Sequence, residues 1–273
     1  MDTFAPVALL NGIAADTEPN ALLALAWSNY GHFTTLRVRG GAVQGLGLHF
    51  DRLRQGNAEL FDAALDDAAV REWMRQASAA SGGDCSLRVT LFSRRFDHRR
   101  PARELEVDVL VTASAPVVPA LRPMRVRSCA WLRTLPHLKH LGTFPLHHHR
   151  RQAVLAGCDD VLFVDGEGAD ARVAEGSVWN LGFWDGEGVV WPQAPALRGT
   201  GERLLQEGLA GQGVAQQIRP VPMAELPRFR AAFAVNANGM RAIAAIDQAA
   251  YAETPELMRL LDAAAAQAAW ESL

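Results

Sequence analysis

The chain has 273 residues, 49% of them apolar, and a formal net charge of −3. This length fits two small domains or one large domain with a substantial core. The basic residues are scattered and no apolar run could span a bilayer, so we expect neither a nucleic-acid partner nor a membrane partner. The first residues do not resemble a signal peptide, and Cys85, Cys129 and Cys158 are widely spaced, which favours a reduced, cytoplasmic location.

The first part of the chain predicts a mixed α/β domain, because segments that alternate like strands adjoin segments with helical periodicity. Asp66 is a suitable cap for the second helix, and a charged loop over 93–103 separates the last two strands. The expected elements are strands at 34–38 and 42–48 joined by the turn Arg39-Gly40-Gly41, helices at 49–61 and 67–77, and strands at 86–92 and 105–111.

Three prolines between 113 and 123 form a stiff, extended connector, which marks a domain boundary. The sequence therefore predicts an N-terminal domain over 1–116, a linker over 117–120 and a larger C-terminal domain over 121–273. In the C-terminal domain we expect strands at 124–131, 161–164, 179–184, 189–191 and 230–235, and helices at 145–156, 201–209 and 255–270.

Among the 27 lysine and arginine residues there is a single lysine, Lys139. Arginine can replace lysine at most surface positions, but it cannot lose its proton at ordinary pH and so cannot attack an aldehyde. Lys139 is therefore a candidate amine nucleophile. The alternative is that Lys139 is a remaining surface lysine without a chemical role.

Four segments together have the residue types that a pyridoxal 5′-phosphate site requires. Such a site needs an amine that forms a Schiff base, an acidic partner for the pyridine nitrogen and a pocket for the phosphate. The segments are His49-Phe-Asp-Arg52-Leu53, Pro136-His-Leu-Lys139-His140, Glu175-Gly-Ser-Val-Trp-Asn180 and Leu197-Arg-Gly199-Thr200-Gly201. Taken singly, Arg52 could be a helix-surface residue, Glu175 a solvent-facing strand end, and the glycines a simple turn.

In the order and spacing of its motifs the chain resembles the class IV (fold type IV) aminotransferases, from about residue 30 to 246. That family includes branched-chain aminotransferases, D-amino-acid aminotransferases and 4-amino-4-deoxychorismate lyase. The motifs are Tyr30-Gly-His-Phe-Thr-Thr-Leu-Arg-Val38, His49-x-x-Arg52-Leu53, Leu138-Lys139-His140, Ala156-Gly-Cys-Asp-Asp160, Val164-Asp165, Glu175-Gly176 with Asn180, Leu197-x-Gly199 and Asn236-Ala-Asn-Gly239.

The resemblance implies a two-domain α/β (α+β) fold with a barrel-like sheet in the larger domain, the cofactor at the domain junction, and a homodimer. It also implies that Lys139 forms the Schiff base to pyridoxal 5′-phosphate and that Glu175 partners the pyridine nitrogen. The other implied cofactor-binding residues are Arg52, Asn180, Gly199, Thr200, Gly201, Asn236, Ala237 and Asn238.

The chain departs from the family pattern at three places. Thr200-Gly201-Glu202 follows Gly199, where the family usually has Ile or Val, then Thr or Met, then Arg. Ala237 replaces a usual Ser or Thr, so the phosphate would rely more on backbone N–H groups. Phe144 stands where branched-chain enzymes carry a tyrosine, and it cannot donate a hydrogen bond. The third departure favours the D-amino-acid and lyase groups.

We expect the substrates to be an amino donor and a keto acid acceptor, with Thr35, Arg37 and Arg133 as candidate substrate-binding residues. Transamination and lyase chemistry both remain open, because each begins with removal of the same proton. A non-catalytic cofactor-binding homologue is a further alternative. We expect no metal site, because the consecutive histidines 147–149 point to different faces of a helix and no acidic residue or cysteine lies at ligand spacing.

Overall fold

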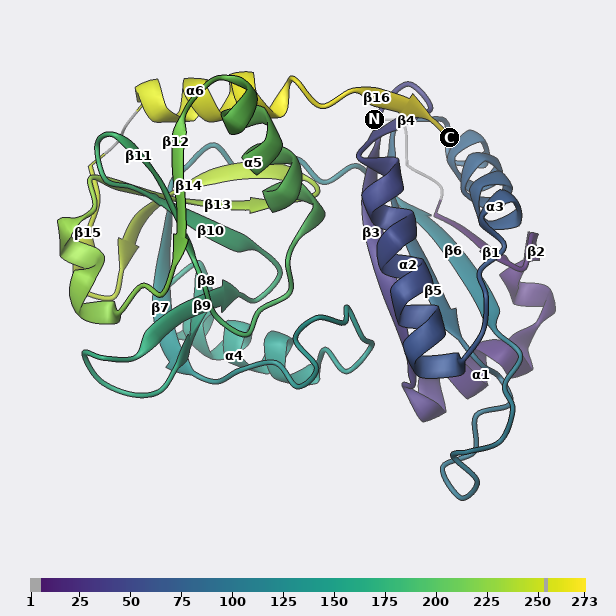
Figure 1. Cartoon of the computed structure of the whole chain (residues 1–273). Coiled ribbons are helices and arrows are strands. Elements are labelled where there is room, and N and C mark those ends of the chain that lie inside the picture. Colours follow the sequence, from purple (N-terminus) through teal and green to yellow (C-terminus); the bar gives the residue numbers. More distant parts are fainter. Residues whose placement is uncertain (1–5, 253–254) are drawn as a thin grey trace. The chain divides into compact units, whose positions relative to one another are not determined.

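A computed structural model describes residues 6–252 and 255–273 of the chain (Figure 1). The chain divides into two compact units that do not follow a single cut in the sequence. The N-terminal unit comprises residues 1–117, 138–142 and 269–273, and the C-terminal unit comprises residues 118–137 and 143–268. Lys139 therefore belongs to the N-terminal unit although it follows the proline-rich connector.

The N-terminal unit is an antiparallel sheet of order β2-β1-β6-β5-β3, with helices α2 and α3 packed on one face (Figure 1). Alternation along β5 sends Leu87, Val89 and Leu91 into the core against these helices, whereas Arg88 and Thr90 lie on the opposite face. The elements are β1 (Val7–Leu10), β2 (Ile13–Ala14), η1 (Ala15–Thr17), α1 (Pro19–Ser28), β3 (Gly31–Val38), β4 (Ala42–Gln44), α2 (Leu46–Phe61), α3 (Asp67–Ala80), β5 (Cys85–Phe92), β6 (Asp108–Ser114) and β16 (Trp270–Ser272).

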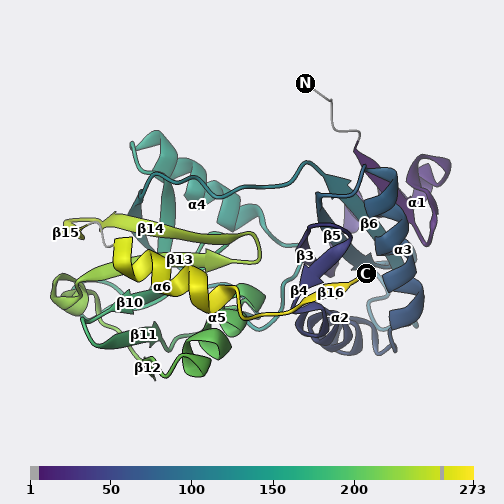
Figure 2. The same cartoon turned by 90° about the horizontal axis from the view of Figure 1, so that it is seen from above.

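The C-terminal unit is built on a curled nine-stranded sheet of order β12-β11-β10-β13-β14-β7-β8-β9, with β15 beside β14. Alternation along β13 turns Phe233 and Val235 toward helices α5 and α6, which lie against each other (Figure 2), and turns Ala232 and Ala234 toward a second core. The elements are β7 (Met124–Ala130), α4 (Phe144–Leu155), β8 (Asp160–Asp165), β9 (Arg172–Gly176), β10 (Asn180–Trp184), β11 (Gly188–Pro192), α5 (Thr200–Gly211), β12 (Ala215–Arg219), η2 (Met223–Arg228), β13 (Ala231–Asn236), β14 (Gly239–Ile246), β15 (Ala249–Ala250) and α6 (Pro255–Ala265).

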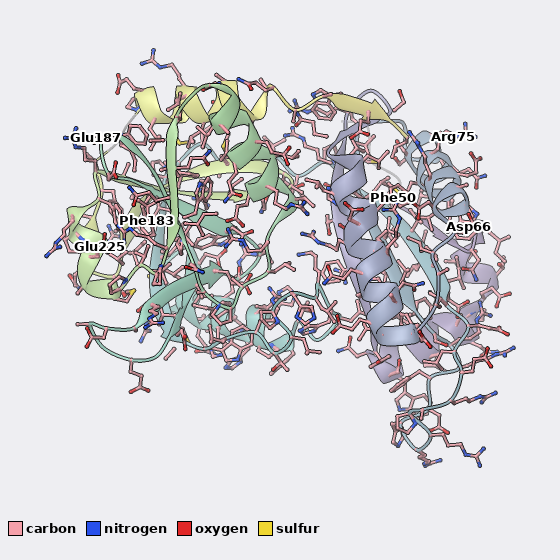
Figure 3. All side chains as sticks on the ribbon, in the orientation of Figure 1. Phe50, Asp66, Arg75, Phe183, Glu187 and Glu225 are labelled. Carbon is pink, nitrogen blue, oxygen red and sulfur yellow. The ribbon has the colours of Figure 1, made fainter. Side chains whose placement is uncertain are left out.

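Labelled side chains in Figure 3 mark both cores and the surface. Phe50 on α2 and Phe183 on β10 are buried, one in each unit, whereas Arg75 on α3 is exposed and paired with Glu72. Asp66 caps α3 as the sequence predicts, because its side chain accepts a hydrogen bond from the N–H of Ala69 at 3.0 Å.

Several predicted elements differ from the structure in their bounds, and three of the differences have a clear cause. The second strand ends at Gln44 rather than at 48, because Gly45 takes a left-handed φ of +64° and starts α2 at Leu46. The strand predicted at 105–111 spans 108–114 instead, where it keeps register with β5. The last helix ends at Ala265, because residues 270–272 leave it and pair with β4. The sequence analysis did not anticipate helix α1 or strands β1, β2, β9, β12, β14, β15 and β16.

The three cysteines carry no disulfide, since all are free thiols in the structure. None of the helices in the described part of the chain is at once long enough and apolar enough to cross a membrane.

The packing of α5 on α6 generates a matched pair of glycine substitutions. A Cβ at Gly208 would lie 2.1 Å from the backbone oxygen of Ala264, whereas a Cβ at Gly211 would meet only the side-chain oxygen of Gln267 at 2.5 Å. Backbone cannot yield without separating the helices, but a glutamine side chain can rotate. We expect Gly208→Ala to lower the free energy of unfolding by about 1–3 kcal/mol. We expect Gly211→Ala to change it by less than about 1 kcal/mol. Urea unfolding curves measure both, and equal losses would contradict the proposed contact.

Candidate functional site

Backbone pairing with β3 holds the segment that contains Lys139. The N–H of Phe33 donates to the Lys139 oxygen and the N–H of Leu141 donates to the Gly31 oxygen, both at 2.9 Å. An isolated bridge between His32 and His140 lies between these bonds. The segment therefore extends the sheet by one short strand-like pairing, and Leu138 and Leu141 on either side of it are buried.

The Lys139 side chain lies on the face of the sheet opposite α2. Its Nζ is 4.9 Å from the centre of the Phe33 ring, and the guanidinium carbon of Arg88 is 3.6 Å from the same centre. Thr35 pairs with Arg88 in register, and Thr35 and Arg37 alternate with the core residues of β3, so they share this face. Burial lowers the pKa of Arg88, but a guanidinium remains charged at ordinary pH.

Arg88 was not among the residues singled out from the sequence. The signal was available, since Arg88 interrupts an apolar strand at a position where alternation places it opposite the core. The N-terminal unit thus groups the predicted residues Lys139, Thr35 and Arg37 with one cation that the sequence interpretation missed.

A buried polar pair lies between β3 and α2. Thr34 Oγ1 and His49 Nδ1 are 2.7 Å apart, and both side chains are buried. Burial and, to a smaller extent, the charges of Arg52 and Lys139 together lower the pKa of His49 to about 3. His49 is therefore neutral near pH 7. Arg52 lies one turn further along α2 and is half-buried, so it is not a fully exposed helix-surface residue.

In the C-terminal unit, Glu175 on β9 is buried and bonded at both carboxylate oxygens. The Nε of Arg133 donates to Oε1 at 2.9 Å, and the N–H of Leu197 donates to Oε2 at 3.3 Å. The two charged side chains are only 3% and 5% exposed, which rules out a solvent-facing strand end. Arg133, expected as a candidate for a substrate carboxylate, donates to Glu175 through its Nε.

Asn180 fixes the turn that leads into α5. Its Nδ2 donates to the Leu197 oxygen at 2.7 Å, and its Oδ1 accepts from the N–H of Gly199 at 3.1 Å. A Cβ at Gly199 would lie 2.2 Å from that Oδ1. Glycine is therefore needed here so that the Asn180 amide can approach the backbone closely.

The two turns predicted to contact a phosphate lie side by side in this unit. A Cβ at Gly201 would be 2.4 Å from the Asn236 oxygen, so the first turn of α5 packs directly on the turn between β13 and β14. Within that second turn the Asn236 side chain accepts from the N–H of Asn238 at 2.9 Å. Helix N-termini carry backbone N–H groups without helical partners and a partial positive charge, so they favour anions. Ala237 and buried Thr200 are part of the same contact region.

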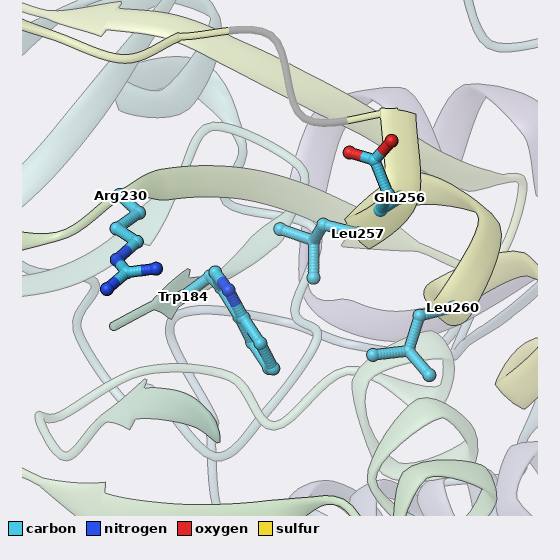
Figure 4. Close-up of a pocket in the computed structure, with 5 residues that line it drawn as sticks. All are labelled: Trp184, Arg230, Glu256, Leu257 and Leu260. Carbon is cyan, nitrogen blue, oxygen red and sulfur yellow. The ribbon is translucent and has the colours of Figure 1, made fainter. Parts of the chain in front are cut away.

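A shallow pocket elsewhere in the C-terminal unit contains none of the predicted site residues. It is lined by Trp184, Arg230, Glu256, Leu257 and Leu260 (Figure 4). Among the residues that the structure describes, no group of three or more histidine, cysteine or acidic side chains is placed to hold a metal ion.

A family profile described as amino-transferase class IV matches residues 31–246. No curated protein sequence matches the chain.

Solved structures match the fold over most of the chain. A branched-chain aminotransferase from the archaeon Thermoproteus uzoniensis, with norvaline, is 18% identical with a TM-score of 0.82, covering 94% of this chain and 93% of its own. A protein from Legionella pneumophila with the provisional name 4-amino-4-deoxychorismate lyase is 20% identical with a TM-score of 0.75, covering 87% and 91%. A hypothetical aminotransferase from Mycobacterium tuberculosis is 23% identical with a TM-score of 0.74, covering 89% and 91%. The mixed α/β structure with its curled sheet is fold type IV, and the chain belongs to the class IV aminotransferase family of enzymes.

Proposed function

We propose that this enzyme binds pyridoxal 5′-phosphate through Lys139 and transfers an amino group from an amino acid or related amine to a keto acid. The observation that carries the proposal is the placement of Lys139, the single lysine of the chain, which is held by backbone bonds to β3 beside Arg88 and Phe33. A primary amine is the one side-chain group that can form a Schiff base, and no other lysine competes for this role.

The residues of the C-terminal unit fit the cofactor's remaining needs. The Glu175 carboxylate is buried and accepts hydrogen bonds from Arg133 and from the N–H of Leu197, and a carboxylate has room to accept another from a pyridinium N–H. The N-terminus of α5, which packs on the Asn236–Asn238 turn, has backbone N–H groups suited to a phosphate. In this proposal Asn180 and Gly199 shape the pocket, and Arg52 supplies a positive charge for the phosphate.

When bound, the cofactor supplies an electron sink that stabilises negative charge at the substrate's α-carbon. In the proposal, Nζ of Lys139 takes the proton from that carbon and later returns it, so the same amine serves as tether and base. Glu175 keeps the pyridine nitrogen protonated. Arg133 stabilises the Glu175 carboxylate by charge and fixes its orientation, since its Nε bond holds one oxygen in place.

The substrate carboxylate requires a cation, and the buried bond of Arg133 to Glu175 makes Arg133 a poor choice. We propose that Arg88 takes this role, supported by Arg37 and the Thr35 hydroxyl on the same face of the sheet. Arg88 is half-buried and lies against the Phe33 ring, which restricts the orientation of its guanidinium.

Elimination from 4-amino-4-deoxychorismate, giving 4-aminobenzoate and pyruvate, is the second candidate function. It is favoured by Phe144, which replaces the tyrosine of branched-chain enzymes and is 75% exposed at the start of α4. Both reactions begin with proton removal by Lys139 and differ in what leaves afterwards. Two parallel incubations distinguish transamination from elimination by their products. One contains amino acids of either handedness with a keto acid, and the other contains aminodeoxychorismate.

We also expect a cytoplasmic homodimer, and light scattering tests the dimer.

Lys139→Arg should keep the fold and lower turnover by at least about 10³-fold, because the charge remains while the nucleophile and base are lost. Borohydride reduction of the wild type with cofactor, followed by peptide mapping, should place the pyridoxyl group on Lys139. Arg99→Lys is the matched control, since it adds a lysine in the exposed loop between β5 and β6. A label on the introduced lysine or on the N-terminal amine, with Lys139 unlabelled, would contradict the proposal.

Glu175→Gln should lower the rate of the half-reaction with a saturating amino donor by about 10²-fold or more, because the pyridine nitrogen loses its charged partner. It should also destabilise the protein by about 3 kcal/mol, since Arg133 would be left buried without an opposite charge. In the double variant Glu175→Gln/Arg133→Gln, we expect stability to recover but the rate to stay low. If the rate recovers with stability, or never falls beyond twofold, Glu175 is not the pyridine partner.

A further inference from the structure

Glu202 occupies the third position of α5, directly after Thr200 and Gly201. The Glu202 side chain is 1% exposed, and its Oε1 is bonded by Nη2 of Arg198. Its Oε2 has no hydrogen-bond partner among the described residues. An acidic residue at this helix position can reach back to the N–H of the capping residue, here Gly199.

The surroundings of Glu202 disfavour its charged form. Burial, with a smaller addition from the Glu175 charge, raises the pKa of its carboxyl to about 7, although Arg198 and the Gly199 N–H act in the opposite direction. Glu175 is itself paired with Arg133. Of the neighbouring elements, β13 carries no ionisable side chain. The charged residues of α6 and β12 are Glu256, Arg259, Asp262 and Arg219, and none of them contributes to the shift.

We propose that Glu202 is a proton-linked positioning residue that sets how tightly the N-terminus of α5 holds a phosphate monoester. The inference rests on the proposed cofactor function, in which that monoester is the phosphate of pyridoxal 5′-phosphate. When Glu202 carries a proton, the positive end of α5 is available to the dianion. When Glu202 is ionised, its carboxylate occupies the same end of the helix and repels the phosphate at short range in a region that excludes water.

The sign of the pH dependence follows from this competition. Below pH 7 the buried carboxyl is protonated and phosphate affinity is high, and affinity falls as the pH rises through the titration of Glu202. Arg198 has a second role here, because it favours the charged form of the carboxyl. Removing Arg198 should therefore move the fall in affinity to higher pH.

The test measures dissociation constants of the full-length protein, freed of cofactor, for pyridoxal 5′-phosphate and for pyridoxal, which lacks the phosphate. The ratio of the two constants isolates the phosphate contribution at each pH. Between pH 6.5 and 8.5 we expect the ratio of the pyridoxal constant to the pyridoxal 5′-phosphate constant to fall in the wild type. The fall should be about tenfold larger than in Glu202→Gln, whose side chain cannot ionise. Glu207→Gln, an exposed change on the same helix, is the control and should behave like the wild type.

Equal pH profiles for wild type and Glu202→Gln would overturn the inference while leaving the cofactor function intact. No binding of pyridoxal 5′-phosphate at any pH would overturn both. If Glu202→Gln does not fold, Arg198→Gln decides, because a purely structural Glu202 would lower affinity at every pH alike, whereas a titrating Glu202 moves the midpoint upward. An unmoved midpoint in Arg198→Gln would count against the proposal.

Discussion

The arrangement of the C-terminal unit depends on the buried ion pair between Arg133 and Glu175. Burying two charges costs several kcal/mol for each ion, and only close geometry with further hydrogen bonds offsets this. The structure supplies both, since the Glu175 carboxylate is bonded by the Arg133 guanidinium and by the N–H of Leu197. Because Leu197 begins the turn before α5, the same carboxylate also positions that turn, and Asn180 completes its attachment. Glu175 therefore links two parts of the proposed cofactor pocket, the Arg133 side chain and the turn before α5.

The N-terminal unit fixes its key residue in a different way. Lys139 is held by sheet-type backbone bonds that any side chain would permit, and the ring of Phe33 and the cation of Arg88 set its chemical surroundings. The backbone bonds to β3 hold the segment, and side chains of β3 and β5 lie beside the amine.

Sequence patterns predicted much of this structure, and the failures have physical causes. Strands β5, β7 and β13 and helices α2, α3 and α5 were found because their periodicity is strong. Gly45 ended a strand early through a left-handed conformation that nothing in the flanking pattern indicates.

For the site residues, the sequence predicts chemical roles more readily than it predicts the partners that each side chain contacts. Lys139 stood out because it is the single lysine. The bond between Arg133 and Glu175 joins residues 42 positions apart, and no local pattern reveals such a partner. Glu202 was noticed only as a departure from the family motif, since its burial depends on tertiary packing.

The return of the last residues to the first unit has a consequence for synthesis on the ribosome. Residues 138–142 and 269–273 belong to the N-terminal unit, and β16 is the strand that pairs with β4. The C-terminal unit, in contrast, has all its residues once position 268 has left the exit tunnel. Domains of nascent chains usually fold in the order in which they emerge. Here the order is reversed at the final step, because the unit that emerges first is completed last.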